Sequence, residues 1–88
     1  MNFKGTNENW RVNSAYKKEV NSDKGVAIAD CSQSKMIDDA EKEANAKLIA
    51  SSPDLLKACN FALQGIKNGQ VDELTVKILE DAILKALS

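Results

Sequence analysis

The single proline of this chain, Pro53, lies between two stretches with helical periodicity and therefore constrains the C-terminal half. A proline cannot donate a hydrogen bond to the carbonyl four residues earlier, and it disfavours helical geometry at the preceding residue. Ser52 is a good N-cap, Pro53 suits the first helical position, and Asp54 adds negative charge in the first turn. The sequence predicts that one helix ends near Ser51 and another begins at Pro53, with a sharp corner between them.

Apolar residues recur every three or four positions on both sides of this corner, as expected for amphipathic helices. The first predicted helix begins after Ser34 as N-cap, and the second runs from Pro53 to about Lys67. Asn68-Gly69 predicts the end of the second helix, because either residue can adopt the left-handed conformation of a C-cap. The apolar stripe of the first helix is Met36, Ile37, Ala40, Ala44 and Leu48, and that of the second is Leu55, Leu56, Cys59, Ala62, Leu63 and Ile66.

A third helix is predicted to start near Asp72. Val71 and Val76 have the spacing of a hydrophobic staple around its N-terminus. Its apolar stripe is Val76, Leu79, Ile83, Ala86 and Leu87, widened by Ile78 and Ala82. The second and third helices together predict a helical hairpin, with the first helix laid across it.

The N-terminal third predicts short strands. The alternation in Asn9–Asn13 places Trp10 and Val12 on one face of a strand. Residues 21–25 have the composition of a turn, and Val26–Cys31 reads as a further strand. Residues 15–20 fit a helical turn, a loop or a strand equally well.

A chain of 88 residues is expected to form one domain. The predicted fold class is α+β, with a short N-terminal antiparallel β-hairpin packed on two to three C-terminal α-helices. Residues 1–8 are expected to be frayed or disordered, with Phe3 as their one anchor; residues 9–33 form the hairpin region and residues 34–88 the helical region. A two-stranded hairpin is marginal alone, so it needs the helices to cover it.

Charge and composition argue against several partners and compartments. The 12 basic and 13 acidic residues give a net charge of −1, without the surplus of Lys and Arg that phosphate neutralisation requires. Nucleic acid is therefore not the expected partner. No apolar stretch approaches the roughly 20 residues needed to cross a bilayer, and no signal peptide is recognisable. We expect a cytoplasmic protein in a reducing environment.

The sequence offers no recognisable active site. It contains no histidine, which is the commonest general base and metal ligand. Cys31 and Cys59 lack the partners of a zinc site, and we expect both to be small buried apolar groups, although a redox pair between them is the alternative. Acidic residues such as Asp38 and Asp39 point in different directions on a helix and do not converge on a metal. We therefore predict no enzyme activity, no catalytic residue, no cofactor and no metal.

One patch combines aromatic and basic residues: Trp10, Arg11 and Tyr16, followed by Lys17-Lys18. Such a patch could stack on a base or bind a phosphate. The simpler interpretation is that Trp10 anchors the core over the hairpin while the two lysines are solvated.

Part of the sequence resembles a stretch found in many small phage and prophage proteins. Residues 43–59, EANAKLIASSPDLLKAC, are similar to the pattern A-N-A-[KR]-L-I-A-A-A-P-[DE]-L-L-x-A, with serines at 51 and 52 in place of alanines. Those proteins often carry a Trp-bearing strand and a short V-A-x-x strand upstream, matched by residues 10–12 and 26–31. They commonly end in A-I-x-K-A-L, matched by residues 82–87.

The resemblance implies a small, non-catalytic phage or prophage accessory protein that binds a host or phage protein. The concrete form is an inhibitor of a bacterial defence system such as a CRISPR effector. A small-ligand, nucleotide or nucleic-acid-binding protein is the alternative. The residues expected on the partner-binding surface are Trp10, Arg11, Tyr16, Ile49, Leu56 and Leu84, of which the last three could instead form a homodimer.

Overall fold

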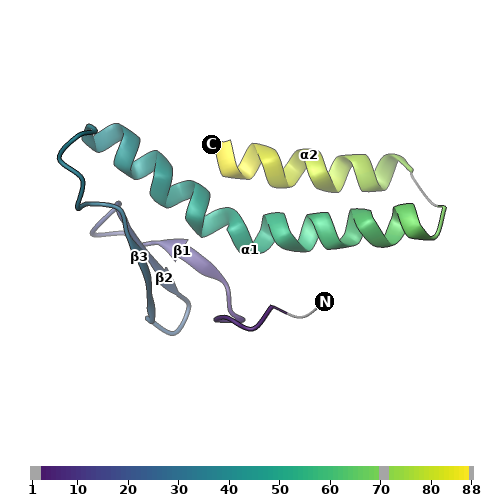
Figure 1. Cartoon of the computed structure of the whole chain (residues 1–88), viewed down its shortest axis with the longest axis horizontal. Helices are drawn as coiled ribbons and strands as arrows, with labels where there is room; N and C mark the ends of the chain where they lie inside the picture. Colours follow the sequence, from purple (N-terminus) through teal and green to yellow (C-terminus); the bar gives the residue numbers. More distant parts are fainter. Residues whose placement is uncertain (1–2, 70–71, 88) are drawn as a thin grey trace. The chain divides into compact units, whose positions relative to one another are not determined.

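The computed structural model describes residues 3–69 and 72–87, and Figure 1 shows their secondary structure. Within these residues three strands are followed by two helices, which confirms the predicted α+β fold with two to three C-terminal helices. The chain forms two compact units, Met1–Ala50 and Ser51–Ser88, here called the N-terminal unit and the C-terminal unit. The long first helix contributes residues to both units, which are described separately.

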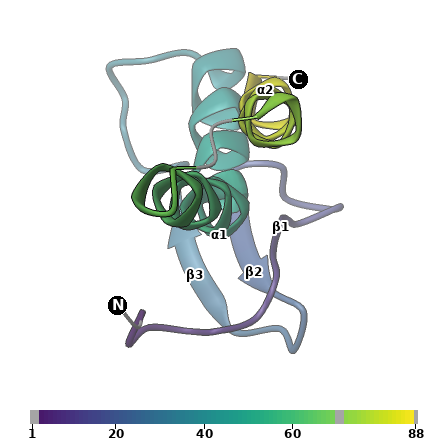
Figure 2. The same cartoon turned by 90° about the vertical axis from the view of Figure 1, so that its right-hand side faces the viewer.

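The N-terminal unit contains a three-stranded antiparallel sheet in the order β1-β2-β3 (Figure 2). The strands are β1 (Trp10–Val12), β2 (Glu19–Ser22) and β3 (Ala27–Asp30). The predicted hairpin is confirmed and consists of β2 and β3, and the strand predicted around Trp10 is confirmed as β1. In the ambiguous segment at residues 15–20, residues 15–18 form a bend and turn, and residues 19 and 20 belong to β2.

The turn between β2 and β3 begins two residues later than predicted, because Asn21 and Ser22 belong to the strand. The backbone N–H of Gly25 donates to the carbonyl of Ser22 at 2.9 Å, and that of Val26 donates to the Ser22 hydroxyl at 3.1 Å. Gly25 has a φ of 85°, which a residue with a side chain rarely adopts. Ser22 thus ends the strand and holds the turn.

The core of the N-terminal unit lies between the sheet and the first part of α1 (Asp39–Lys67). Val20 in the central strand and Ala46 in the helix are both fully inaccessible to solvent. Ser22 is equally buried, and its hydroxyl accepts the turn hydrogen bond from Val26. A polar side chain is tolerated there because its hydrogen-bonding capacity is used.

Helix α1 begins five residues later than Ser34, so this boundary was predicted wrongly. Asp38 is the N-cap: its Oδ1 accepts a hydrogen bond from the backbone N–H of Glu41 at 2.9 Å. A carboxylate caps better than a hydroxyl here, because it also carries charge at the positive end of the helix. Ser34 instead accepts the N–H of Met36 within the preceding loop, and Met36 is 94% exposed rather than part of a buried stripe.

Pro53 lies inside α1 and does not divide it, so the predicted end of one helix near Ser51 and start of another at Pro53 are wrong. The fixed φ of proline is compatible with a helix, and its position costs the hydrogen bond that residue 53 would donate to the carbonyl of Ile49. Residues on both sides are mostly good helix formers, and extending an existing helix is far easier than nucleating a new one. Helix propagation therefore outweighs the local preference for a break.

The end of α1 and the start of α2 (Glu73–Leu87) follow the sequence prediction. Gly69 has a φ of 72°, as a C-terminal glycine should. Asp72 caps α2 by accepting hydrogen bonds from the Thr75 backbone N–H and hydroxyl, both at 3.0 Å, and these bonds lower the pKa of its carboxyl group. The staple predicted between Val71 and Val76 lies outside the described residues.

Small side chains form the inner row of the C-terminal unit, where α2 runs antiparallel to the second part of α1 (Figure 1). The buried residues are Ser51, Ala58, Ala62, Thr75 and Ala86. Lys85 and Asp54 form an ion pair that joins the two helices. Val76, Ile83 and Leu87, predicted for the buried stripe of α2, are about half exposed or more, whereas Ala82 and Ala86 of the same predicted stripe face α1 together with Thr75.

The position of Pro53 inside a helix predicts a stabilising substitution. In Pro53→Ala, residue 53 regains an N–H that can bond to the Ile49 carbonyl, so we expect at least about 1 kcal/mol of added stability. For a domain of this size, that corresponds to a rise in Tm of roughly 4–8 °C, measured by circular dichroism at the helical minimum.

Gln64→Ala is the matched control. It also places alanine at an exposed position within α1, but residue 64 already has a backbone N–H, so the substitution restores no hydrogen bond. It should change stability by less than about 0.5 kcal/mol. An unchanged or lower Tm for Pro53→Ala would instead support a helix that starts at Pro53.

Candidate functional site

The aromatic and basic residues of the N-terminal unit do not gather into one patch. Trp10 is half-buried: its indole N–H donates to the Thr6 carbonyl at 3.2 Å, and the Phe3 ring meets it edge-on with centroids 6.3 Å apart. Phe3 and Thr6 therefore tie the segment before β1 to this indole. Arg11 is exposed on β1 and points to the face opposite Trp10.

Tyr16 is the most exposed aromatic side chain of the described residues, at 70%. The turn that carries it is held by Asn13, whose Oδ1 accepts the backbone N–H groups of Ala15 at 2.8 Å and Tyr16 at 3.0 Å. The Nδ2 of Asn13 donates to Oδ1 of Asn21 in β2 at 2.9 Å. Hydrogen bonds to the sheet therefore fix a turn that presents an uncovered aromatic ring.

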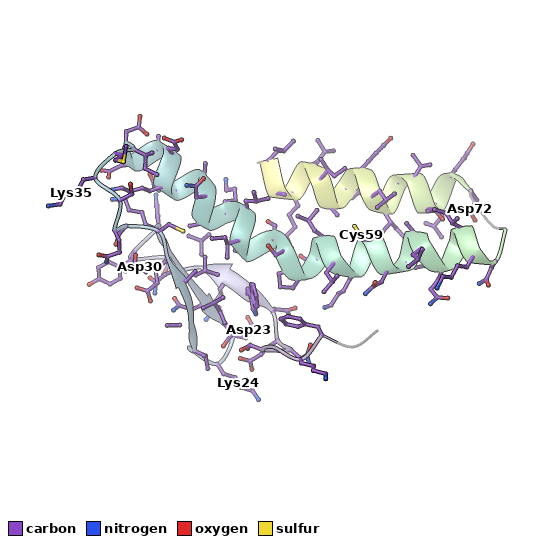
Figure 3. All side chains as sticks on the ribbon, in the orientation of Figure 1. Asp23, Lys24, Asp30, Lys35, Cys59 and Asp72 are labelled. Atoms are coloured by element: carbon purple, nitrogen blue, oxygen red, sulfur yellow. The ribbon has the colours of Figure 1, made fainter. Side chains whose placement is uncertain are left out.

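An open groove, here called the Tyr16 groove, lies beside this turn within the N-terminal unit and has a volume of about 520 Å³. It is bounded by the turn, the end of β3 and the first turns of α1. The lining residues are Ala15, Tyr16, Lys17, Lys18, Glu19, Asp30, Ser32, Asp39 and Glu43. Asp30 stands at the end of β3, as labelled in Figure 3.

The ionised groups of the Tyr16 groove are mainly acidic, with four carboxylates and two ammonium groups. The Nζ of Lys18 lies 3.0 Å from Oδ1 of Asp39. This hydrogen bond, and then the charge of Lys18, lower the pKa of Asp39. The pKa of Asp30 is also lowered, by hydrogen bonds from the side chain and backbone of Ser32 and the side chain of Gln33. Both aspartates are therefore charged near neutral pH.

Ile49 borders a second groove of the N-terminal unit, of about 460 Å³. Its apolar wall consists of Cys31, Ile37, Leu48 and Ile49. Cys31 is half-buried and free, in agreement with the prediction that its thiol packs as a small apolar group. Ile49 is itself half-buried, so it is less available to a partner than the sequence suggested.

The remaining candidates, Leu56 and Leu84, lie in the C-terminal unit with exposures of 44% and 64%. Leu84 follows the inner residue Ala82 by two positions, which turns it away from α1. Leu56 follows the inner residue Leu55 by one position and lies at the flank of α1. Cys59 lies on the same flank and is a free, exposed thiol, so the prediction that it is buried was wrong (Figure 3).

The described residues contain no group of three or more Cys, Asp or Glu side chains placed to hold a metal ion. They also contain no helix that is both long enough and apolar enough to cross a membrane. The carboxylates of the Tyr16 groove come from β2, β3 and α1. Sequence reasoning missed this cluster, because Asp30, Asp39 and their neighbours meet only through the packing of the sheet on the helix.

The ion pair between Lys18 and Asp39 predicts a measurable change in acidity. In Lys18→Ala, the pKa of Asp39 should rise towards the ordinary aspartate value of about 3.9, as followed by NMR titration of the carboxyl carbon. Asp30 is the internal control, since its pKa depends on Ser32 and Gln33. Because the pKa of Asp39 is lowered in the folded state, the pair stabilises the fold above the ordinary aspartate pKa. That stability is lost as the pH falls through the folded pKa.

An Asp39 pKa that stays low in Lys18→Ala would show that another group, such as Lys42, holds the charge. A parallel rise at Asp30 would show that the substitution disturbs the whole groove.

No curated protein and no solved structure matches the chain. A family model described as Salmonella phage P22 protein Y8K6 matches it over residues 1–88. This match confirms the inference of a small phage protein, which the sequence resemblance had suggested. Since the match covers the whole chain, the protein belongs to the Salmonella phage P22 protein Y8K6 family.

Proposed function

We propose that this protein is a non-catalytic phage accessory protein that binds a protein of the phage or of its bacterial host in the host cytoplasm. The observation that carries the proposal is the Tyr16 groove, where an exposed ring stands beside a mainly acidic surface. Tyrosine is enriched in protein interfaces because it supplies a large rigid contact area and one polar group. The acidic lining fits a basic segment of a partner protein.

The same charges disfavour the alternative partners. A nucleotide or a nucleic acid would bring phosphates towards four carboxylates, and one of the two lysines of the groove is already paired with Asp39. The groove volume is within the usual range for small ligands, so a small cationic molecule is the second candidate.

The narrower form of the proposal is that the partner belongs to a bacterial defence system, such as a CRISPR effector, and is inhibited by the binding. Membership of a phage protein family supports this form, together with a surface suited to protein contacts. Binding without catalysis is sufficient for such a role, since covering a partner's working surface already blocks it.

A pull-down from phage-infected host cells tests the proposal. The tagged full chain should recover one host or phage protein in a stable complex. Tyr16→Ala should weaken capture at least tenfold, the loss typical of an interface residue worth about 1.4 kcal/mol or more. Recovery of nucleotides or nucleic acid alone would refute the proposal.

Met36→Ala is the matched control for Tyr16→Ala, because Met36 is also highly exposed and lies outside the Tyr16 groove. It should capture the partner as well as the wild type does. For the narrower form, expression of the chain should raise phage plating efficiency on a host with an active defence system. Unchanged plating across such hosts would contradict it.

A further inference from the structure

The C-terminal unit exposes a second row of apolar residues beside the inner row between its helices. The inner row consists of Leu55, Ala58, Ala62 and Gly65 on α1, and of Thr75, Ile78, Ala82 and Ala86 on α2; all are buried or half-buried. The residue after each of them is apolar. These following residues are Leu56, Cys59, Leu63 and Ile66 on α1, and Val76, Leu79, Ile83 and Leu87 on α2.

These eight residues lie on one side of the helical pair and are here called the apolar face. Each step of one residue along a helix rotates the side chain by about 100° about the helix axis. On both helices, the apolar residues are therefore rotated in the same sense from the inner row. Because α1 and α2 run antiparallel, this shared sense carries both rows to the same side (Figure 1). Leu84, two positions after Ala82, falls outside the apolar face.

We propose that a second copy of this chain covers the apolar face, so that two C-terminal units form a four-helix bundle. The exposure of the face is the first argument. Ile66, Val76, Ile83 and Leu87 are 60%, 48%, 51% and 78% exposed, whereas no large apolar side chain of the described residues 51–69 and 72–87 is fully buried. Two helices that bury mainly alanine, serine and threonine against each other lack the core that normally stabilises helices of this length.

The area of the face is the second argument. A fully exposed aliphatic side chain carries on the order of 100 Å² of apolar surface, so the face offers roughly 300–400 Å². An interface of standard size covers about 800 Å² on each partner, and in homodimers about 65% of that is apolar. The face therefore supplies most of the roughly 500 Å² required, and the aliphatic stems of side chains at its rim can add to it.

Charge at the rim is the third argument, and it favours a second copy over an unrelated partner. Lys57 and Lys67 lie on the outer edge of α1, two positions after inner residues, whereas on the outer edge of α2 the acidic Glu73 and Glu80 outnumber Lys77. In a dimer whose two-fold axis is parallel to the helices, α1 of each copy lies over α2 of the other copy. Adjacent helices of the bundle then run antiparallel to each other. The basic edge of one copy then meets the acidic edge of the other, twice.

The mass of the purified full chain in solution tests this proposal. Sedimentation equilibrium should give twice the 9.6 kDa of one chain at micromolar concentration. Ile83→Lys should shift the protein to the monomer, because it places a charge at the centre of the apolar face. Leu84→Lys is the matched control: it adds the same charge to a neighbouring residue that is even more exposed but lies off the face, and it should remain a dimer.

Thiol accessibility provides a second readout, which does not depend on Ile83→Lys remaining folded. In the wild type, the maleimide modification of Cys59 should slow at least tenfold as the protein concentration rises through the dimerisation range. The rate at Cys31, in the N-terminal unit, should not change with concentration. This measurement concerns the isolated chain, so it is independent of the partner captured through the Tyr16 groove.

Three results would overturn the proposal. A monomeric wild type with a reactive Cys59 at all concentrations would mean that the face awaits a different protein. A monomer with Cys59 protected at all concentrations would mean that the N-terminal unit of the same chain covers it. A dimer that both lysine substitutions leave intact would place the interface elsewhere and would equally refute the apolar face as the contact.

Discussion

Small side chains between the two helices of the C-terminal unit determine what the rest of that unit presents to its surroundings. Ala58 and Ala62 on α1 and Thr75 and Ala86 on α2 are buried. Each of these side chains removes little apolar area from water, so the contact contributes less to stability than a row of leucines would. Because an apolar residue stands one position after each residue of the inner row, the packing that joins the helices also creates the apolar face.

The N-terminal unit is held together differently, with a fully buried Val20 and many local hydrogen bonds from polar side chains. Asn13 and Ser22 hold the two turns of the sheet, and Asp38 caps the helix that covers it. The ion pair between Lys18 and Asp39 then joins the Tyr16 turn to that helix. These fixed contacts give the Tyr16 groove defined walls although the unit is small. A preformed surface loses little conformational freedom on binding, which favours affinity.

The sequence predicted the elements better than it predicted their contacts. Periodicity located both helices, but it could not choose between adjacent apolar rows, since Ala82 and Ile83 are both apolar and hydrophobicity alone favours burying the larger. Local rules predicted a break at Pro53, whereas the cooperativity of an established helix decided otherwise. Ser34 was predicted as the cap of α1, but the structure caps this helix with Asp38 instead, which only the geometry of the preceding loop decides. The acidic groove was beyond prediction, because Lys18 and Asp39 meet through tertiary packing.

The binding role proposed above would use two surfaces of different character, one in each of the two units. The apolar face suits a permanent contact, because water-exposed leucine and isoleucine side chains are costly to leave uncovered. The Tyr16 groove is charged and polar at its rim, as is typical of contacts that form and dissociate. The proposed dimer, paired through the apolar face, would carry two Tyr16 grooves. A partner that is itself multimeric then gains from the high effective concentration of the second groove, so that two weak contacts can bind tightly without a larger interface.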